Sequence, residues 1–206
     1  YRQITPEAVA GRVSDADVVI FVGGISPDLE GEDKYFVNCP GFSGGDRTTI
    51  ELPEVQRNIL KALKQAGKKV IFVNCSGSAI ALVPETKSCD AILQAWYPGQ
   101  AGGTAVADVL FGDYNPSGKL PVTFYKNTDQ LPDFENYDMK GRTYRYMTET
   151  PLYPFGYGLS YTTFDISKGR LSKNVISTNQ TVTFKANVKN TGKREGTEVV
   201  QVYVRK

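Results

Sequence analysis

Three short apolar runs constrain the fold of this chain more than any other feature. Val18–Val22 is a continuous run of β-branched and aromatic residues, Lys69–Asn74 reads KVIFVN, and Ala91–Trp96 is a third run. Apolar runs of this length without polar alternation are typical of strands buried on both faces of a parallel sheet. We therefore predict three such strands.

Helical patterns lie around these runs. Thr5–Val13 begins with a Thr cap and a Pro at the first helical position. Leu52–Ala66 carries apolar residues at helical spacing and is followed by Gly67, a common C-terminal stop. Gln100–Phe111 is predicted to be a third helix. Strands that alternate with helices predict an α/β fold, in which a mostly parallel sheet is flanked by helices.

The C-terminal part follows a different pattern. Thr181–Val188 and Glu198–Arg205 alternate between polar and apolar residues, which predicts half-buried antiparallel strands of a β-sandwich. Because such a sandwich takes about seven strands and roughly 100 residues, we expect a truncated β-sandwich here. The start at Tyr1, without Met or a signal-peptide pattern, also suggests a fragment. The predicted division is an α/β domain (1–125), an extended wrapping segment with an aromatic connector (126–164), and the incomplete β-sandwich (165–206).

Composition excludes several classes of function. The net charge of +2, with both signs interspersed over 206 residues, does not indicate a nucleic-acid surface. Since there is no histidine, this chain cannot form a Ser-His-Asp or Cys-His site by itself. Its three cysteines form no CxxC pair, so neither zinc nor a disulfide framework is implied, and Cys75 and Cys89 are expected to be small buried hydrophobes. No run reaches the roughly 18 apolar residues of a membrane span.

A candidate site lies where the predicted strands end. Gly24, Ser76 and Tyr97 follow the three strands, and the carboxyl ends of parallel strands meet at one edge of a sheet, where ligands bind in open α/β folds. A long loop without periodicity leaves this edge after Gly24 and extends to Arg47. Ordinary connections in α/β units span about 2 to 6 residues, so a loop this long is expected to be functional.

The loop is acidic at its start. Asp28, Glu30, Glu32 and Asp33 lie close together in it. Burial of a carboxyl at a sheet edge, beneath a partner domain, raises its pKa and suits it to act as a general acid. A solvated acidic turn or a calcium loop would show the same local pattern, and both alternatives remain open at this point.

Two other pairs are candidates for substrate contacts. Asp46 and Arg47 follow Gly44-Gly45 and could orient a polar ligand, although a turn with a helix cap explains the pattern equally well. Trp96, followed by Tyr97 at a strand end, could stack against a sugar ring. Core packing beneath the loop is the alternative for Trp96.

Four segments in order carry a family resemblance. They are LEGED after the first strand, GGDR with ELPEVQRNIL, AWYPGQAGGTAVADVLFGDYNPSGKLPVTF, and YPFGYGLSYTTF. Residues 13–206 thereby resemble the C-terminal part of glycoside hydrolase family 3, the β-glucosidases and β-xylosidases. Tyr157 departs from the pattern, since many relatives carry His there.

The resemblance implies an α/β sandwich domain followed by the start of a fibronectin type III-like domain. In that family an N-terminal barrel supplies an Asp nucleophile, and the α/β domain supplies the acid/base Glu. The acid/base corresponds to Glu30 by its distance from Gly24 and its LEG context, with Glu32 as the alternative register. Asp46 and Arg47 match the family's DR pair, which we interpret as supporting the loop.

The implied function is part of an exo-acting retaining β-glycosidase that hydrolyses terminal β-linked xylose or glucose from oligosaccharides. Its partner would be the barrel domain of the same enzyme, so this fragment is expected to be inactive alone. The resemblance implies no metal and no cofactor, and a periplasmic or secreted location. A non-catalytic carbohydrate-binding or structural module is the alternative interpretation.

Overall fold

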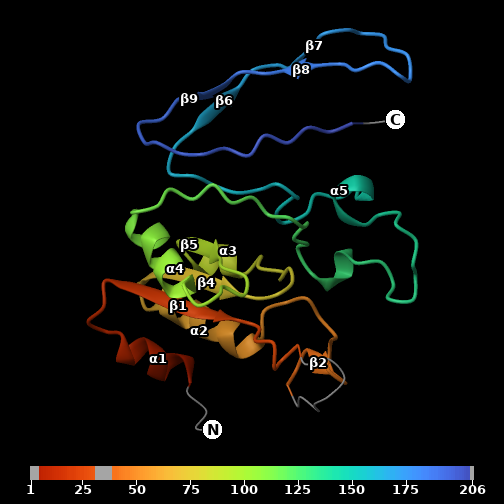
Figure 1. Ribbon diagram of the computed structural model, residues 1–206. Coiled ribbons are helices and arrows are strands. Elements are labelled where there is room, and N and C mark those ends of the chain that lie inside the picture. Colours follow the sequence, from red (N-terminus) through yellow and green to blue (C-terminus); the bar gives the residue numbers. More distant parts are fainter. Residues whose placement is uncertain (1–4, 31–38, 205–206) are drawn as a thin grey trace. The chain divides into compact units, whose positions relative to one another are not determined.

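A computed structural model describes residues 5–30 and 39–204, which form two compact units. Unit 1 comprises Tyr1–Val106 and Leu120–Phe155, and unit 2 comprises Ala107–Lys119 and Gly156–Lys206. The elements, labelled in Figure 1, are α1 (Pro6–Arg12), β1 (Val18–Gly24), β2 (Phe42–Ser43), β3 (Asp46–Arg47), α2 (Glu54–Gln65), β4 (Lys69–Cys75), α3 (Glu85–Ser88), β5 (Ala91–Gln94), α4 (Gly102–Phe111), the 3₁₀ helix η1 (Thr128–Gln130), α5 (Thr143–Tyr146), β6 (Phe164–Ile166), β7 (Arg170–Leu171), β8 (Phe184–Lys185) and β9 (Val188–Asn190).

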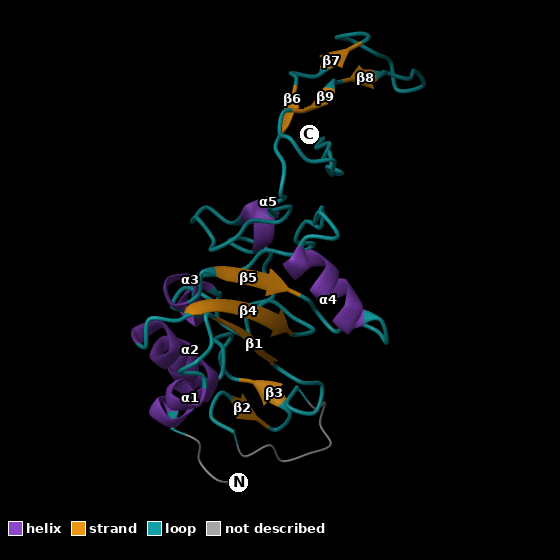
Figure 2. Ribbon diagram, turned by 90° about the vertical axis from the view of Figure 1, so that its left-hand side faces the viewer, coloured by secondary structure: helices purple, strands orange, loops and turns teal. Residues whose placement is uncertain are grey.

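A parallel three-stranded sheet forms the centre of unit 1. The strand order is β1-β4-β5, with β4 in the middle (Figure 2). Gly24 lies opposite Cys75, and Asn74 lies opposite Gln94, so the three strands end at the same edge. The prediction of an α/β fold with a parallel sheet and helices is confirmed.

The core lies between this sheet and helices α1 and α2. Leu60 and Leu63 of α2 are fully buried against Val70 and Phe72 of β4, and Val9 of α1 packs against the same cluster. The start of α1 and the end of α2 agree with the sequence prediction, whereas α2 begins at Glu54, two residues after the predicted start at Leu52. The Thr5 hydroxyl accepts a hydrogen bond from the Ala8 amide, and Gly67 follows α2 with a φ of +76°, which favours glycine.

The prediction that the first strand is buried on both faces was wrong. Val18, Ile20 and Val22 are 48%, 44% and 65% exposed, whereas Val19 and Phe21 pack against the core. The reason is that the side chains of Val19 and Phe21 pack against the core, while the opposite face of β1 is left open by the described residues. Only the central strand, β4, has the near-continuous burial that the apolar pattern predicted.

The long loop after β1 contains a small hairpin. Strands β2 and β3 pair Phe42 with Arg47 and Ser43 with Asp46. Gly44 and Gly45 connect them with φ values of +60° and +88°, as a two-residue hairpin turn of type I′ requires. One interpretation of Gly44-Gly45-Asp46-Arg47 was a turn with a helix cap. The turn is present, but it leads into strand β3 and not into a helix.

Within unit 1, residues 120–155 pack against the α/β part of the chain. Thr128 donates its amide and its hydroxyl to the Glu51 carboxylate at 2.9 and 2.6 Å. Phe124 is buried and forms a β-bridge with Tyr153. These contacts hold residues 124–153 against the α/β body, and the predicted wrapping segment of residues 126–164 stays a prediction.

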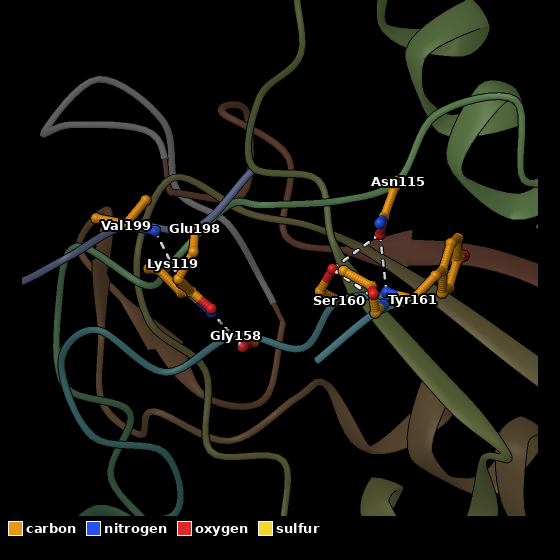
Figure 3. Close-up of polar contacts among 8 residues, drawn as sticks. Asn115, Lys119, Gly158, Ser160, Tyr161, Glu198 and Val199 are labelled. Atoms are coloured by element: carbon orange, nitrogen blue, oxygen red, sulfur yellow. Dashed lines mark hydrogen bonds and ion pairs between the residues drawn. The ribbon is translucent and has the colours of Figure 1, made fainter. Parts of the chain in front are cut away.

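In unit 2 the NPSGK motif contacts the GYGLSY motif (Figure 3). The Asn115 side-chain oxygen accepts hydrogen bonds from the Ser160 hydroxyl and the Tyr161 amide at 2.9 and 2.8 Å. Lys119 donates to the Gly158 carbonyl at 2.8 Å and forms an ion pair with Glu198 at 3.0 Å. These two sequence motifs therefore have a structural role in connecting the segments of unit 2.

The predicted C-terminal strands form only in part. Strand β8 and strand β9 lie within or beside the predicted 181–188 strand, and they pair with β7 and β6 in two antiparallel ribbons. Residues 198–204, predicted as a strand, have no strand assignment. A strand requires a second strand to which its backbone can hydrogen-bond. In the described chain, neither the β6-β9 nor the β7-β8 ribbon provides one for residues 198–204. The three-part division at 125 and 164 stays a prediction.

Leu63→Ala tests the packing of α2. Removing this fully buried side chain should lower the free energy of unfolding by about 2 to 5 kcal/mol, because the cavity cannot fully collapse. The fluorescence of Trp96, the single tryptophan of the chain, reports unfolding in urea. Val55→Ala on the same helix, at a side chain that is 61% exposed, is the control and should change stability by less than about 0.5 kcal/mol. Equal effects of both substitutions would contradict the packing described here.

The thiol of Cys89 should be unreactive at ordinary pH. Burial, followed by the charges of Glu85 and Asp90, raises the pKa of Cys89 to about 12. The neutral thiol therefore predominates at pH 8.5, and a variant with Cys39→Ser and Cys75→Ser should react with iodoacetamide roughly a thousandfold more slowly than glutathione. The rate should continue to rise above pH 10. Alkylation as fast as that of glutathione would show that Cys89 is not in this environment.

Candidate active site

The candidate site lies at the carboxyl-terminal edge of the sheet in unit 1. The end of β1 is fixed by α2, because the Gln56 side chain donates to the Gly24 carbonyl at 2.7 Å and accepts from the Gly24 amide at 2.8 Å. A side chain at Gly24 would overlap the Cys75 carbonyl, and the φ of +125° also favours glycine. The segments that follow the three strands therefore leave this edge side by side, as predicted.

Glu30 is the carboxylate at this edge. The loop after β1 begins with a tight turn in which the Ser26 carbonyl accepts hydrogen bonds from the amides of Leu29 and Glu30. Glu30 Oε1 lies 2.7 Å from Ser78 Oγ, and Glu30 Oε2 lies 2.7 Å from Tyr97 Oη. One carboxylate thus contacts residues that follow β4 and β5, although it is itself carried by the loop after β1.

Arg47 reaches the same group through Ser78. Its Nη1 donates to Ser78 Oγ at 2.9 Å and to the Ala79 carbonyl at 3.1 Å, and its Nε donates to the Thr49 carbonyl at 3.2 Å. Burial lowers the pKa of Arg47, and the negative charge of Glu30 opposes this shift. The guanidinium supplies positive charge close to Glu30, and it also lines a groove of about 660 Å³ with Thr128, Phe134 and Tyr137.

Tyr97 is held in place by an unusual backbone conformation at the preceding residue. Trp96 has a φ of +57°, in the left-handed region that a bulky residue rarely adopts and that is often found at functional sites. This turn directs the Tyr97 hydroxyl back across the ends of the strands, where it lies 2.8 Å from the Ile25 carbonyl as well as near Glu30. Desolvation, together with the hydrogen bond and charge of Glu30, raises the pKa of Tyr97 to about 12, so its phenol is neutral near pH 7.

A buried polar layer supports Ser78 from below. Ser76 Oγ donates to the Ser78 carbonyl at 2.8 Å and accepts from the Gln94 amide at 3.1 Å. The Asn74 amide donates to Gln94 Oε1 at 2.6 Å, and both Asn74 and Ser76 are fully buried. The hydrogen bonds of Ser76 therefore link the turn that carries Ser78 to the buried ends of β4 and β5.

The remaining sequence-predicted residues are not brought together with Glu30. Asp46 is exposed on β3, and since neighbouring side chains of a strand point to opposite faces, it points away from the Arg47 side. Trp96 packs edge-on against the buried Phe124, with ring centroids 6.1 Å apart, which agrees with the core-packing interpretation. Glu32, like Asp33, lies outside the described residues, so the calcium-loop alternative stays open.

Sequence reasoning did not identify Ser78 and Tyr97 as partners of a carboxylate, nor the role of Gly77. An ideal Cβ on Gly77 would lie 2.6 Å from the Tyr97 ring and 3.2 Å from Glu30 Oε2. Glycine is therefore required there by the close approach of both side chains. The available signal was the position of SGS and WY directly after two neighbouring strands, at the same edge as the acidic loop.

In the part of the chain that the structure describes, no cluster of three or more His, Cys, Asp or Glu residues is arranged to hold a metal. Among the same residues, no helix is both long and apolar enough to cross a membrane.

A parallel sheet with a carboxylate at its carboxyl-terminal edge defines an α/β domain with a site at the strand ends. Residues 3–161 match the family model described as the glycosyl hydrolase family 3 C-terminal domain. The chain therefore belongs to glycosyl hydrolase family 3, which confirms the resemblance seen in the sequence.

Individual relatives agree with this assignment. The chain is 65% identical over 91% of its length to a xylan 1,4-beta-xylosidase of Xylanibacter ruminicola, and 44% identical over 92% to a periplasmic beta-glucosidase of Salmonella typhimurium. A solved β-glucosidase structure from Erythrobacter marinus superposes with a TM-score of 0.76 at 38% identity, over 92% of this chain and 25% of that one. The chain spans only 21% and 25% of the length of the two curated relatives.

Gly77→Ala tests the close packing at the site. The added methyl group should displace the Tyr97 ring and break its contact with Glu30, which a crystal structure of the variant would show. Gly99→Ala is the matched control, because nothing lies within 4 Å of a Cβ at that position. Unchanged positions of Tyr97 and Glu30 in the Gly77→Ala variant would contradict the geometry of this site.

Proposed function

We propose that this chain is the C-terminal part of an exo-acting retaining β-glycosidase and that Glu30 is its general acid/base. The observation that carries the proposal is the placement of Glu30 at the sheet edge, with each carboxylate oxygen within 2.7 Å of a hydroxyl from a neighbouring strand end. Membership of glycosyl hydrolase family 3 supports the reaction class.

The chemistry requires a second carboxyl. A retaining glycosidase uses two carboxyls about 5 to 5.5 Å apart, one as nucleophile and one as acid/base. We propose that the nucleophile is an Asp of an N-terminal barrel domain in the same enzyme. Glu30 would protonate the leaving oxygen as the nucleophile attacks the anomeric carbon, and its carboxylate would then take a proton from the water that hydrolyses the glycosyl intermediate. This chain alone would be inactive.

The proposed substrates are oligosaccharides with terminal β-linked xylose or glucose. The high identity to a protein named xylan 1,4-beta-xylosidase favours xylose. Arg47, with the groove that it lines, is proposed to lie near the substrate, while Asp46 would support the loop and Trp96 would shape the site from beneath. No cofactor is proposed. A periplasmic or secreted location is part of the same proposal, and one relative is named as periplasmic.

Glu30→Gln in the longer protein that contains this chain tests the proposal. With an unactivated oligosaccharide, kcat/KM should fall by about 10² to 10⁴-fold, because general acid catalysis contributes roughly that much. With an activated aryl glycoside, the first step needs no acid, so the intermediate should accumulate and added azide should restore turnover. The product should be the β-glycosyl azide.

Glu32→Gln is the matched control for this experiment. It should retain most of the activity and should not respond to azide. If the two results were exchanged, Glu32 would be the acid/base and our register would be wrong. Turnover like that of the wild type in both variants would contradict catalysis by this loop and would favour a non-catalytic carbohydrate-binding module.

A further inference from the structure

The hydroxyl of Tyr97 lies near two acceptors but has only one proton to donate. The phenol oxygen lies 2.8 Å from the Ile25 carbonyl and 2.7 Å from Glu30 Oε2, and both of these atoms are acceptors when Glu30 is ionised. A phenol has one proton to donate, although its oxygen can also accept. At any moment, therefore, only one of the two contacts can be a full hydrogen bond donated by Tyr97.

The Ile25 carbonyl is a fixed acceptor. Ile25 is 1% exposed, and its amide donates to the Cys75 carbonyl at 2.9 Å, which continues the β1–β4 ladder past the end of β1. The Tyr97 ring is fixed as well, since it packs over Gly77 and follows the left-handed turn at Trp96. The hydroxyl proton is thus the part of this group that can move without displacing any heavy atom.

We propose that Tyr97 is a positioning residue for Glu30 and that its proton alternates between two acceptors as Glu30 gains and loses its own proton. When Glu30 is ionised, Tyr97 donates to Oε2 and stabilises the charge. When Glu30 carries a proton on Oε2, the Tyr97 O–H turns to the Ile25 carbonyl, so that two donors do not face each other. No proton leaves Tyr97 in either state, and its high pKa is consistent with this.

This arrangement suits a residue that must be an acid in one step and a base in the next, and so it rests on the proposed function of Glu30. Ser78 contacts the other carboxylate oxygen. Its Oγ donates to Glu30 Oε1 whether or not Oε2 carries a proton, and it accepts from Arg47 Nη1. Among the described residues, the charged or titratable groups around Glu30 are Tyr97 and Arg47, with Glu51 acting on Arg47 as a second negative charge. Tyr97, whose pKa is raised to about 12, does not change its charge between pH 4 and pH 9.

The test is the pH dependence of kcat/KM in the longer protein with Tyr97→Phe. The substitution removes a donor to the ionised carboxylate, so the ionised form of the acid/base is disfavoured. The alkaline limb of the profile should therefore move to higher pH, by about 0.5 to 1 pH unit for a donor of this kind at a partly exposed site. The deglycosylation rate, which needs the ionised form, should shift in the same direction.

Two further variants complete the test. Ser78→Ala removes the other hydroxyl donor and should move the limb in the same direction, which keeps the proposal testable if Tyr97→Phe fails to fold. Tyr125→Phe is the matched control, because it removes a phenol that accepts from the Thr143 amide and does not contact Glu30. It should leave the limb in place.

The outcomes separate this proposal from the one on which it rests. If Glu30→Gln shows the loss of activity and the azide rescue, but Tyr97→Phe lowers kcat without moving the limb, the positioning role is wrong and the acid/base assignment stands. If Glu30→Gln has wild-type activity, the acid/base assignment itself is wrong. A shift toward lower pH in Tyr97→Phe would also overturn the proposal, since it has the opposite sign.

Discussion

The parallel pairing of β1, β4 and β5 is the constraint on which the site depends. Parallel strands end at a common edge, and the register that aligns Gly24 with Cys75 also brings Ile25, Ser76 and the turn at Trp96 to that edge. A shift of one residue in this register would exchange the faces of every side chain on the shifted strand. The contact between Glu30 and Tyr97 would then be lost. The burial of Leu60 and Leu63 against β4, although remote from the edge, therefore stabilises the site as well as the fold.

The polarity of the strand ends explains how a carboxylate is placed by groups that are far apart in the sequence. Glu30 contacts hydroxyls 48 and 67 residues away, and beneath Ser78 lies a layer of buried amide and hydroxyl groups. The hydrogen bonds of this buried layer fix geometry more than they add stability, because their formation offsets a desolvation cost. The acid/base role that we propose for Glu30 requires such fixed partners, because a catalytic group has to be held in its productive geometry.

Much of this architecture could be predicted from the sequence, because it depends on local patterns. The apolar runs, the Thr5 and Gly67 helix signals and the shared strand edge all followed from periodicity and from the chemistry of capping. The Gly44-Gly45 turn was one of two interpretations, and the structure contains it with positive φ at both residues, whereas the orientation of a ligand by Asp46 and Arg47 stays a prediction. The position of Glu30 followed from its distance to Gly24 and from the family resemblance.

The remainder depends on partners that no local pattern contains. The apolar sequence of β1 resembles that of β4, yet one face of β1 is exposed because burial depends on which neighbours are present. The alternation of residues 198–204 likewise cannot specify a strand without a partner for its backbone. Ser78 and Tyr97 were not predicted as carboxylate partners, because their contact with Glu30 depends on register and on the left-handed turn at Trp96.

Proton donation by Glu30 to the leaving group, as proposed, is measured by the dependence of kcat/KM on the acidity of that leaving group. A series of aryl glycosides whose phenols span several pKa units would be hydrolysed by the longer protein and by its Glu30→Gln variant. The dependence should be shallow for the wild type, because the departing oxygen is protonated as it leaves, and steep for Glu30→Gln. The same slope in both proteins would show that Glu30 does not donate this proton.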